Sequence, residues 1–237
     1  MFTIRMNTRK SKHLVLTVAA VLAIVLSAAW SNAQQLRQGI SVQMPVTSSA
    51  TTMSEADDED AWIIGVTPDG GLYFGVDPVT PDGLAIKMKA RPRNRQQNLY
   101  IKADARAPYA DVEKVLQAGR TVFFETAVLL TSQTQSSEPG TIVPPRGLEV
   151  LLVAPAGSMP AQVQLINSGE HTPILKINNR QIPLANLQNM LAQILQDRRE
   201  KVVLVKANGQ LPFADVVQVI DACHSAGAKV VLAIPGM

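Results

Sequence analysis

The fold is decided by residues 203–222, which read VLVKANGQLPFADVVQVIDA. The apolar run Val202–Val205 predicts a buried strand, and the spacing of apolar residues after Pro212 predicts a helix from Phe213 to Ser225. Gly227 is well placed to end this helix in a left-handed turn, and residues 229–234 predict a closing strand. The stretch therefore predicts a strand, a helix and a second strand around one core, with four helix residues directed inward: Phe213, Val216, Val217 and Ile220.

The same stretch occurs a second time in the chain. An offset of about 104 residues superposes residues 99–118 on residues 203–222, and about eight of the 20 aligned positions are identical, where chance would give about one or two. Tyr109 also faces Phe213 in this alignment. The repeat predicts a duplicated structural unit, and the identical pairs are Lys102 and Lys206, Ala103 and Ala207, Pro108 and Pro212, Ala110 and Ala214, Asp111 and Asp215, Val112 and Val216, Val115 and Val219, and Ala118 and Ala222.

The first copy begins with a β-hairpin signal. Two β-favouring runs, residues 62–66 and 72–76, flank the turn residues Pro68-Asp69-Gly70-Gly71. A helix-compatible stretch, residues 81–90, follows the hairpin. The rest of the copy is predicted as a strand over residues 99–103, a helix from about Tyr109 and a strand over residues 127–131.

The second copy repeats this plan. Residues 163–166 and 174–177 flank a turn at Ser168-Gly169 and predict the hairpin. One apolar run, residues 148–153, precedes this hairpin and is predicted to be a strand that could pair with either copy. Apolar residues then recur at helical spacing along one face: Leu184, Leu187, Leu191, Ile194 and Leu195.

These signals predict an α+β protein with two tandem small modules after one N-terminal hydrophobic helix. Each module contains a β-hairpin, a helix, a strand, a helix and a strand. Residues 34–61 are rich in Gln, Ser, Thr and acidic residues with no sustained period, so a flexible tether is expected there. The predicted segments are a basic leader (1–13), the hydrophobic helix (14–30), the tether (31–61), the first module (62–131), a Pro- and Ser-rich linker (132–147) and the second module (148–237).

The hydrophobic segment Leu14–Trp30 carries no charge and is preceded by four basic residues, which places its start on the cytoplasmic side by the positive-inside rule. Its length of about 17 residues lies between a spanning helix of about 20 and a signal-peptide core of about 7 to 15. Two interpretations stay open. Trp30 favours a retained single-pass anchor, and the small residues of Ser31-Asn32-Ala33 favour cleavage before Gln34.

Composition limits the chemistry of the exported part. The net charge is +3, and the four basic residues of the leader account for more than this charge, so the rest of the chain is close to neutral. A nucleic-acid partner is therefore not expected. Cys223 is the only cysteine, and no two of the three histidines have metal-ligand spacing, so neither a disulfide nor a metal site nor any cofactor is expected. Cys223 and His224 could suggest a nucleophile and a base, but neighbours on a helix point about 100° apart.

Residues 203–222, followed by Ala226-Gly227-Ala228-Lys229-Val230, closely resemble the periplasmic signature of the ExbD/TolR family of biopolymer transport proteins. Ile101-Lys102-Ala103-Asp104 and Pro108-Tyr109-Ala110-Asp111-Val112 resemble the same signature in the first copy, which lacks the Ala-Gly turn at the matching place. The resemblance covers residues 62–131 and 163–234. The motif residues, with structural or binding roles, are Asp104, Pro108, Tyr109, Asp111, Pro212, Phe213, Asp215, Asp221 and Gly227.

Physical chemistry gives these motif residues mainly structural roles. Pro108 and Pro212 suit a first helical turn, where a missing N–H costs nothing, and Asp111 and Asp215 favour the positive helix end. The aromatic residue after each proline fills the joint between strand and helix. No catalytic residue is expected: the local spacing brings no second acid near Asp104, Asp111, Asp215 or Asp221, as a hydrolase would require.

The resemblance implies an accessory subunit of an ion-driven motor in the bacterial inner membrane, with a periplasmic C-terminal part. Its implied partners are an ExbB/TolQ-like membrane protein and either a TonB-like protein or peptidoglycan. The family's membrane helix carries a proton-accepting aspartate, whereas Leu14–Trp30 has no acidic residue. A binding role is therefore expected without a side-chain proton relay.

Leader cleavage, or a catalytic role for the motif carboxylates, would give two other functions. Cleavage before Gln34 would release a periplasmic scaffold that binds cell-wall glycan or protein and has no motor role. An envelope hydrolase would depend on one of the four carboxylates above. In the leading interpretation the modules pair through sheet edges or helix faces, with each other or in a homo-oligomer.

Overall fold

A computed structural model describes residues 39–92, 97–132, 143–169 and 172–234. Apart from Val143, these residues belong to one compact unit, residues 36–135 and 144–237. The hydrophobic segment Leu14–Trp30 lies outside the described residues. Within the described ranges, no helix is both long and apolar enough to cross a bilayer.

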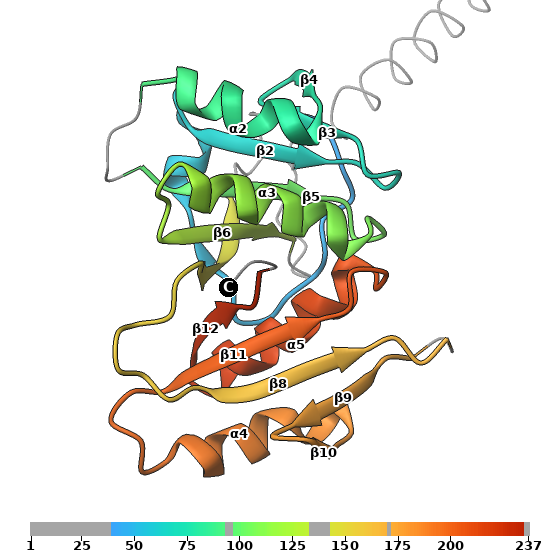
Figure 1. The fold of residues 1–237 in the computed structure, drawn as a ribbon, viewed down its shortest axis with the longest axis vertical. Helices are drawn as coiled ribbons and strands as arrows, with labels where there is room; N and C mark the ends of the chain where they lie inside the picture. The colour runs from blue at the N-terminus through green and yellow to red at the C-terminus, as the bar shows by residue number, and fades with distance from the viewer. Residues whose placement is uncertain (1–38, 93–96, 133–142, 170–171, 235–237) are drawn as a thin grey trace, which may run out of the picture. The chain divides into compact units, whose positions relative to one another are not determined.

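Twelve strands of the described chain form one mixed sheet (Figure 1). Strand β7 is at its centre, with five strands on each side in equivalent order, and β1 (Thr51–Thr52) pairs with β7 outside this path. From one edge the order is β4 (Asp77–Val79), β3 (Leu72–Phe74), β2 (Trp62–Val66), β5 (Leu99–Ala103), β6 (Thr126–Thr131), β7 (Arg146–Leu151), β12 (Lys229–Leu232), β11 (Val202–Ala207), β8 (Ala161–Ile166), β9 (Ile174–Ile177) and β10 (Arg180–Gln181).

Four α-helices of the described residues connect these strands, which confirms the predicted α+β class. Thr80 caps the first of them by accepting a hydrogen bond from the Gly83 N–H at 3.1 Å, with Pro81 as the first helical residue. The helices are α2 (Pro81–Ala90), α3 (Tyr109–Thr121), α4 (Leu187–Leu195) and α5 (Phe213–Ser225), and short 3₁₀ helices occupy Ser54–Asp57 and Leu184–Asn186.

The two halves follow the predicted plan. β2 and β3 form an antiparallel hairpin, as do β8 and β9, and β2–β5–β6 and β8–β11–β12 are each joined in parallel. The edge strands β4 and β10 were not predicted, because two or three residues, one of them Pro78, give no detectable period.

One buried apolar cluster extends through both halves between the helices and the sheet. Trp62, Tyr109 and Phe213 are the largest side chains in it and are at most 1% exposed. Leu187, Leu191 and Leu195 enter the cluster from α4 as their spacing predicted, whereas Leu184 is 42% exposed because it lies in the preceding 3₁₀ helix.

Strand β7 joins the halves. It pairs antiparallel with β6 over its full length, from Thr126↔Leu151 to Thr131↔Arg146, and parallel with β12 at Val231↔Leu151. Sequence left open which half this strand would join, and the structure shows that it joins both. The two halves therefore share one continuous sheet.

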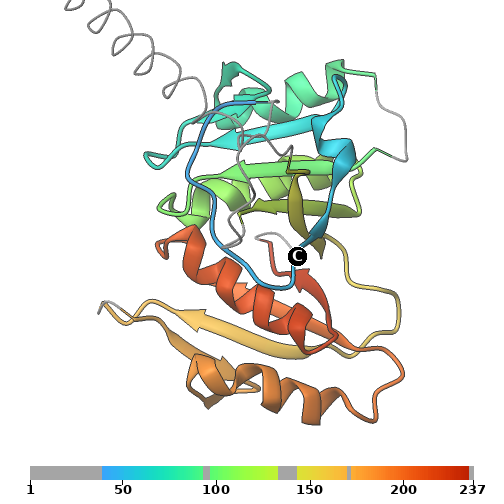
Figure 2. The same ribbon diagram turned by 180° about the vertical axis from the view of Figure 1, so that it is seen from behind.

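Residues 40–61, here called the strap, pack against the sheet in place of the expected flexible tether. The strap covers the sheet face opposite the first-half helices, where Ile63, Tyr100 and Val128 form a second small core with strap residues Ala56 and Met53. Figure 2 shows the strap, in blue, running across the strands of the first half and past α5 before it returns to β2. Composition misled here because the strap is held by polar contacts to distant residues.

Both long helices end in the same left-handed turn. Gly227 (φ 74°) follows α5 and its N–H donates to the His224 carbonyl, while the Ala228 N–H donates to the Cys223 carbonyl. Phe123 (φ 66°) occupies the equivalent position after α3, and the N–H groups of Phe123 and Phe124 donate to the carbonyls of Arg120 and Gly119. The first copy lacks the Ala-Gly sequence, but its chain forms the same turn with Phe123, which is 85% exposed.

This difference predicts opposite effects of two substitutions. A non-glycine residue in the left-handed region costs about 1 kcal/mol, so Phe123→Gly should raise the free energy of unfolding by about 0.5 to 1 kcal/mol. Gly227→Ala should lower it by about 1 kcal/mol, since a Cβ there meets no atom within 4 Å and only the backbone strain acts. Urea unfolding of both variants measures this, and a destabilised Phe123→Gly protein would contradict it.

Candidate functional site

The two motif turns pair with each other through a reciprocal set of backbone hydrogen bonds. The N–H groups of Tyr109 and Ala110, which begin α3, donate to the carbonyls of Leu211 and Gly209 at 2.9 Å each. The N–H groups of Phe213 and Ala214, which begin α5, donate to the carbonyls of Ala107 and Ala105 at 2.8 and 2.9 Å. Pro108 and Pro212 lie opposite each other as an antiparallel bridge.

This pairing satisfies groups that a helix cannot satisfy by itself. The first N–H groups of any helix have no carbonyl partner within it, and neither proline can cap with a side chain. Each half therefore supplies the carbonyls that the other half's helix requires. Gly209 is needed for this approach, because a Cβ at that position would lie 2.9 Å from the Ala110 Cβ.

Asp104 and Asn208 shape the two turns in the same way. The Asp104 carboxylate accepts a hydrogen bond from the Arg106 N–H at 3.1 Å, and the Asn208 side-chain oxygen accepts one from the Gln210 N–H at 2.9 Å. Such a turn needs an acceptor two residues before the donor and not a negative charge. A structural role for the motif acid is consistent with this geometry.

The aromatic residues after the two prolines are fully buried. Within the described residues the Tyr109 hydroxyl has no hydrogen-bond partner. Burial above all, and the Glu113 carboxylate nearby, raise the pKa of Tyr109 far above its usual value, so the phenol stays neutral. Phe213 fills the equivalent position without a hydroxyl.

Asp221 and Asp104 fasten the strap. The Asp221 carboxylate accepts hydrogen bonds from the backbone N–H and hydroxyl groups of Ser48 and Ser49, at 2.5 to 2.9 Å. Burial alone would raise the pKa of Asp221, but these bonds outweigh burial and lower it. Hydrogen bonds from the Arg106 side chain lower the pKa of Asp104, which also accepts the Gln43 N–H at 3.1 Å.

The strap residues were missed by sequence reasoning. Ser48 and Ser49 lie more than 170 positions from Asp221 in the chain, and no local pattern links them. The serines match a composition typical of linkers, so no signal in the sequence alone could have identified this contact.

The remaining motif acids lie in different surroundings. Asp111 forms an ion pair with Lys114 at 2.7 Å and lies against the hairpin turn, where a Cβ added to Gly70 would overlap its carboxylate. Asp215 forms no ion pair within the described residues and lines an open groove of about 1000 Å³ beside α5. Burial raises the pKa of Asp215. The structure thus brings Pro108 and Pro212 together, buries Tyr109 and Phe213, and gives the four carboxylates different neighbours.

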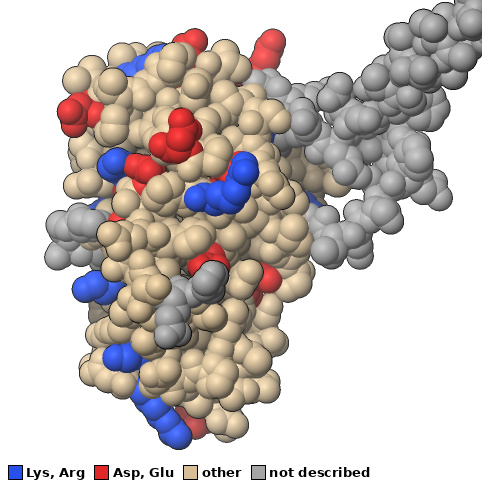
Figure 3. Space-filling model, turned by 90° about the vertical axis from the view of Figure 1, so that its right-hand side faces the viewer, with Lys and Arg blue, Asp and Glu red and all other residues tan. Residues whose placement is uncertain are grey.

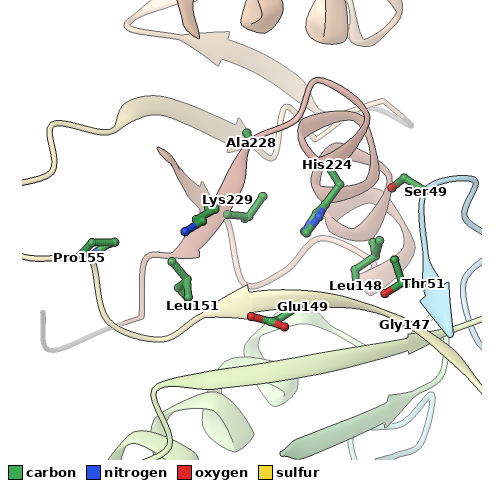
Figure 4. Close-up of a pocket in the computed structure, with 11 residues that line it drawn as sticks. Ser49, Thr51, Gly147, Leu148, Glu149, Leu151, Pro155, His224, Ala228 and Lys229 are labelled. Carbon is green, nitrogen blue, oxygen red and sulfur yellow. The ribbon is translucent and has the colours of Figure 1, made fainter. Parts of the chain in front are cut away.

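A second, smaller pocket of about 420 Å³ opens where β7 and β12 diverge, between Ser49, Glu149, His224 and Lys229 (Figure 4). Figure 4 shows His224 pointing from α5 toward β7. Desolvation lowers the pKa of His224, and its Nε2 atom has no hydrogen-bond partner in the described part of the chain. Burial raises the pKa of the neighbouring Cys223 thiol to about 12, so the thiol is protonated at neutral pH and is a poor nucleophile.

Basic side chains do not form a continuous stripe on the described face drawn in Figure 3. Figure 3 shows Lys and Arg scattered among uncharged and acidic residues on one face. Lys87 pairs with Asp77 at 2.8 Å, and the Arg91 guanidinium lies 5.0 Å from the Trp62 ring centre. Among the described residues, no three His, Cys, Asp or Glu side chains are grouped as a metal site would require.

An exchange of the two buried aromatic residues tests the role of the hydroxyl. Tyr109→Phe should leave the free energy of unfolding unchanged or raise it by up to about 1 kcal/mol, because it removes a buried polar group without a partner. Phe213→Tyr should lower it by about 1 to 3 kcal/mol, because it adds such a group. Chemical unfolding measures both, and a Tyr109→Phe variant that loses stability would show that the hydroxyl has a partner.

Removal of the Asp221 carboxylate should release the strap. In Asp221→Ala, hydrogen exchange at the amides of Ser48 and Ser49 should accelerate about tenfold or more, because their acceptor is gone. Gln117→Ala, at the equivalent exposed position of α3, is the matched control and should change nothing at these amides.

The same contact has a predictable pH dependence. Because the folded pKa of Asp221 is lowered, its stabilising contribution is present above the unfolded value of about 3.9 and is lost as the pH falls below it. Protection of the two serine amides should therefore persist from neutral pH to below about pH 4 and disappear only as the pH falls through the lowered folded pKa of Asp221. Loss of protection near pH 6 would contradict the assignment.

A comparison with protein families gives two matches along this chain. The model of the family described as biopolymer transport protein ExbD/TolR matches residues 16–134 and residues 135–235. No curated protein matches the sequence. The two matched segments together span most of the chain, and each contains one copy of the motif whose turns pair in the structure. The chain belongs to the ExbD/TolR family of biopolymer transport proteins.

Proposed function

We propose that this chain is an accessory component of an ion-driven biopolymer transport or envelope-energisation system and acts by binding. The family match suggests such a component. The observation that carries the proposal is the reciprocal pairing of the two motif turns, which gives one chain two copies of the family unit in a defined pair. A paired unit offers a partner two related surfaces at once.

The proposed partner in the membrane is an ExbB/TolQ-like protein, and the proposed location is the bacterial inner membrane with residues 34–237 in the periplasm. A TonB-like protein or peptidoglycan is the proposed partner on the periplasmic side. The uncharged Leu14–Trp30 segment supports anchoring, and its lack of an acidic residue supports a role without proton relay.

Co-purification tests the motor association. The full chain, tagged at its C-terminus, should retain an ExbB/TolQ-like membrane protein in mild detergent. Asp221→Ala, which frees the strap but leaves Leu14–Trp30 intact, should still retain it if the contact is made within the membrane. Repeated failure to find such a partner would contradict the proposal.

One rival function has its own support in the sequence. Ser31-Asn32-Ala33 offers small residues at the positions that a signal peptidase reads, and cleavage there would give a periplasmic scaffold without a motor role. Sequencing the N-terminus of the mature protein separates the two functions. Gln34 as the first residue would support the scaffold, and an intact leader would support the anchored component.

A further inference from the structure

The two halves differ in one feature where their sequences are otherwise alike. Asp111 and Asp215 hold the same position in the first turns of α3 and α5. Lys114 neutralises Asp111 from the next helical turn, and the β2–β3 turn packs on the carboxylate through Gly70. At the position equivalent to Lys114, the second half has Gln218, which cannot neutralise Asp215.

Asp215 lies in a groove that is mainly apolar. Four of its apolar lining residues, Leu165, Leu175, Ile182 and Val219, are buried, whereas Ile174 is partly exposed and Pro183 and Leu184 are exposed, Leu184 to 42%. Ser168, Thr172, Gln181 and Gln218 supply neutral polar groups. Asp215 is the single charged residue among the described residues that line the groove.

This combination determines what chemistry fits the groove. A carboxylate beside apolar surface loses part of its hydration, and a cation that approaches it from a partner regains that energy as a charge-assisted hydrogen bond. Apolar side chains next to the cation would cover Leu184 and its neighbours. The first half satisfies the same carboxylate with its own lysine and its own hairpin turn, whereas in the second half no described lysine or arginine pairs with it.

We propose that the groove between α5, the β8–β9 hairpin and the segment Gln181–Leu184 is a docking site for a protein partner segment with an arginine or lysine flanked by apolar residues. Asp215 receives the cation, and the exposed residues Leu184 and Pro183, with the partly exposed Ile174, contact the apolar side chains. The inference deepens the proposed binding function and rests on it only for the assumption that the partner is a protein.

Short fluorescein-labelled peptides test the site on the full chain in mild detergent. The three probes have one central residue between valine and leucine neighbours: arginine, citrulline or glutamate. Fluorescence anisotropy should show binding of the arginine peptide, with citrulline about tenfold weaker and glutamate weaker still. Absence of arginine-peptide binding, or equal binding of the citrulline peptide, would overturn the proposal.

Variants of the chain locate the effect. Asp215→Asn should weaken the arginine peptide about tenfold and leave the citrulline peptide unchanged, whereas Asp111→Asn, the matched acid of the first half, should change neither. Equal losses in both variants would indicate general attraction to an acidic protein and would overturn the site. Leu184→Ser should weaken all three peptides.

Gln218→Lys gives a test that does not remove a native group. Gln218 is exposed on α5, and a lysine there reproduces the Asp111–Lys114 spacing of the first half. The variant should fold normally and lose the preference for arginine over citrulline, because Asp215 then has an internal partner. Retention of the full preference would overturn the role of Asp215. Failure of these tests alongside successful membrane-partner purification would reject this site and leave the proposed function standing.

Discussion

The rest of the structure depends on the reciprocal pairing of two helix starts. A helix that begins after proline has no side-chain cap, and its first N–H groups need acceptors from elsewhere. In this chain the acceptors for α3 are the carbonyls of Gly209 and Leu211, and those for α5 are the carbonyls of Ala105 and Ala107. Neither half is complete without the other, so the duplicated sequence forms one paired unit joined further by β7.

Duplication has placed equivalent residues of the two halves in different surroundings. Equivalent positions are free to diverge where the pairing does not require them, as shown by Lys114 and Gln218, Phe123 and Gly227, and Gln117 and Asp221. The first half is covered by the strap on one sheet face and has its helix-start acid neutralised. The second half holds the strap through Asp221, and its Asp215 lines the groove beside α5.

Sequence reasoning predicted the elements with strong local signals. Helices α3 and α5 begin where proline, aromatic and acidic residues indicated, α2 occupies the stretch expected to be helix-compatible, and the inner strands occur where apolar runs indicated. The packing of the strap could not be predicted, because it depends on hydrogen bonds from Ser48 and Ser49 to Asp221, which no local sequence pattern indicates. Pairing of the two motif turns was equally hidden, since one copy's sequence does not show that its partner is the other copy. The binding roles of the motif acids stay a prediction.

The course of the strap has a mechanical consequence for a protein tethered near its N-terminus. From Gly39 onward, its attachments follow one another along the chain: Gln43 to Asp104, Thr47 to Thr131, Ser48 and Ser49 to Asp221, and β1 to β7. Tension applied at residue 39 would load these attachments one after another instead of together, so they would unzip in sequence at low force.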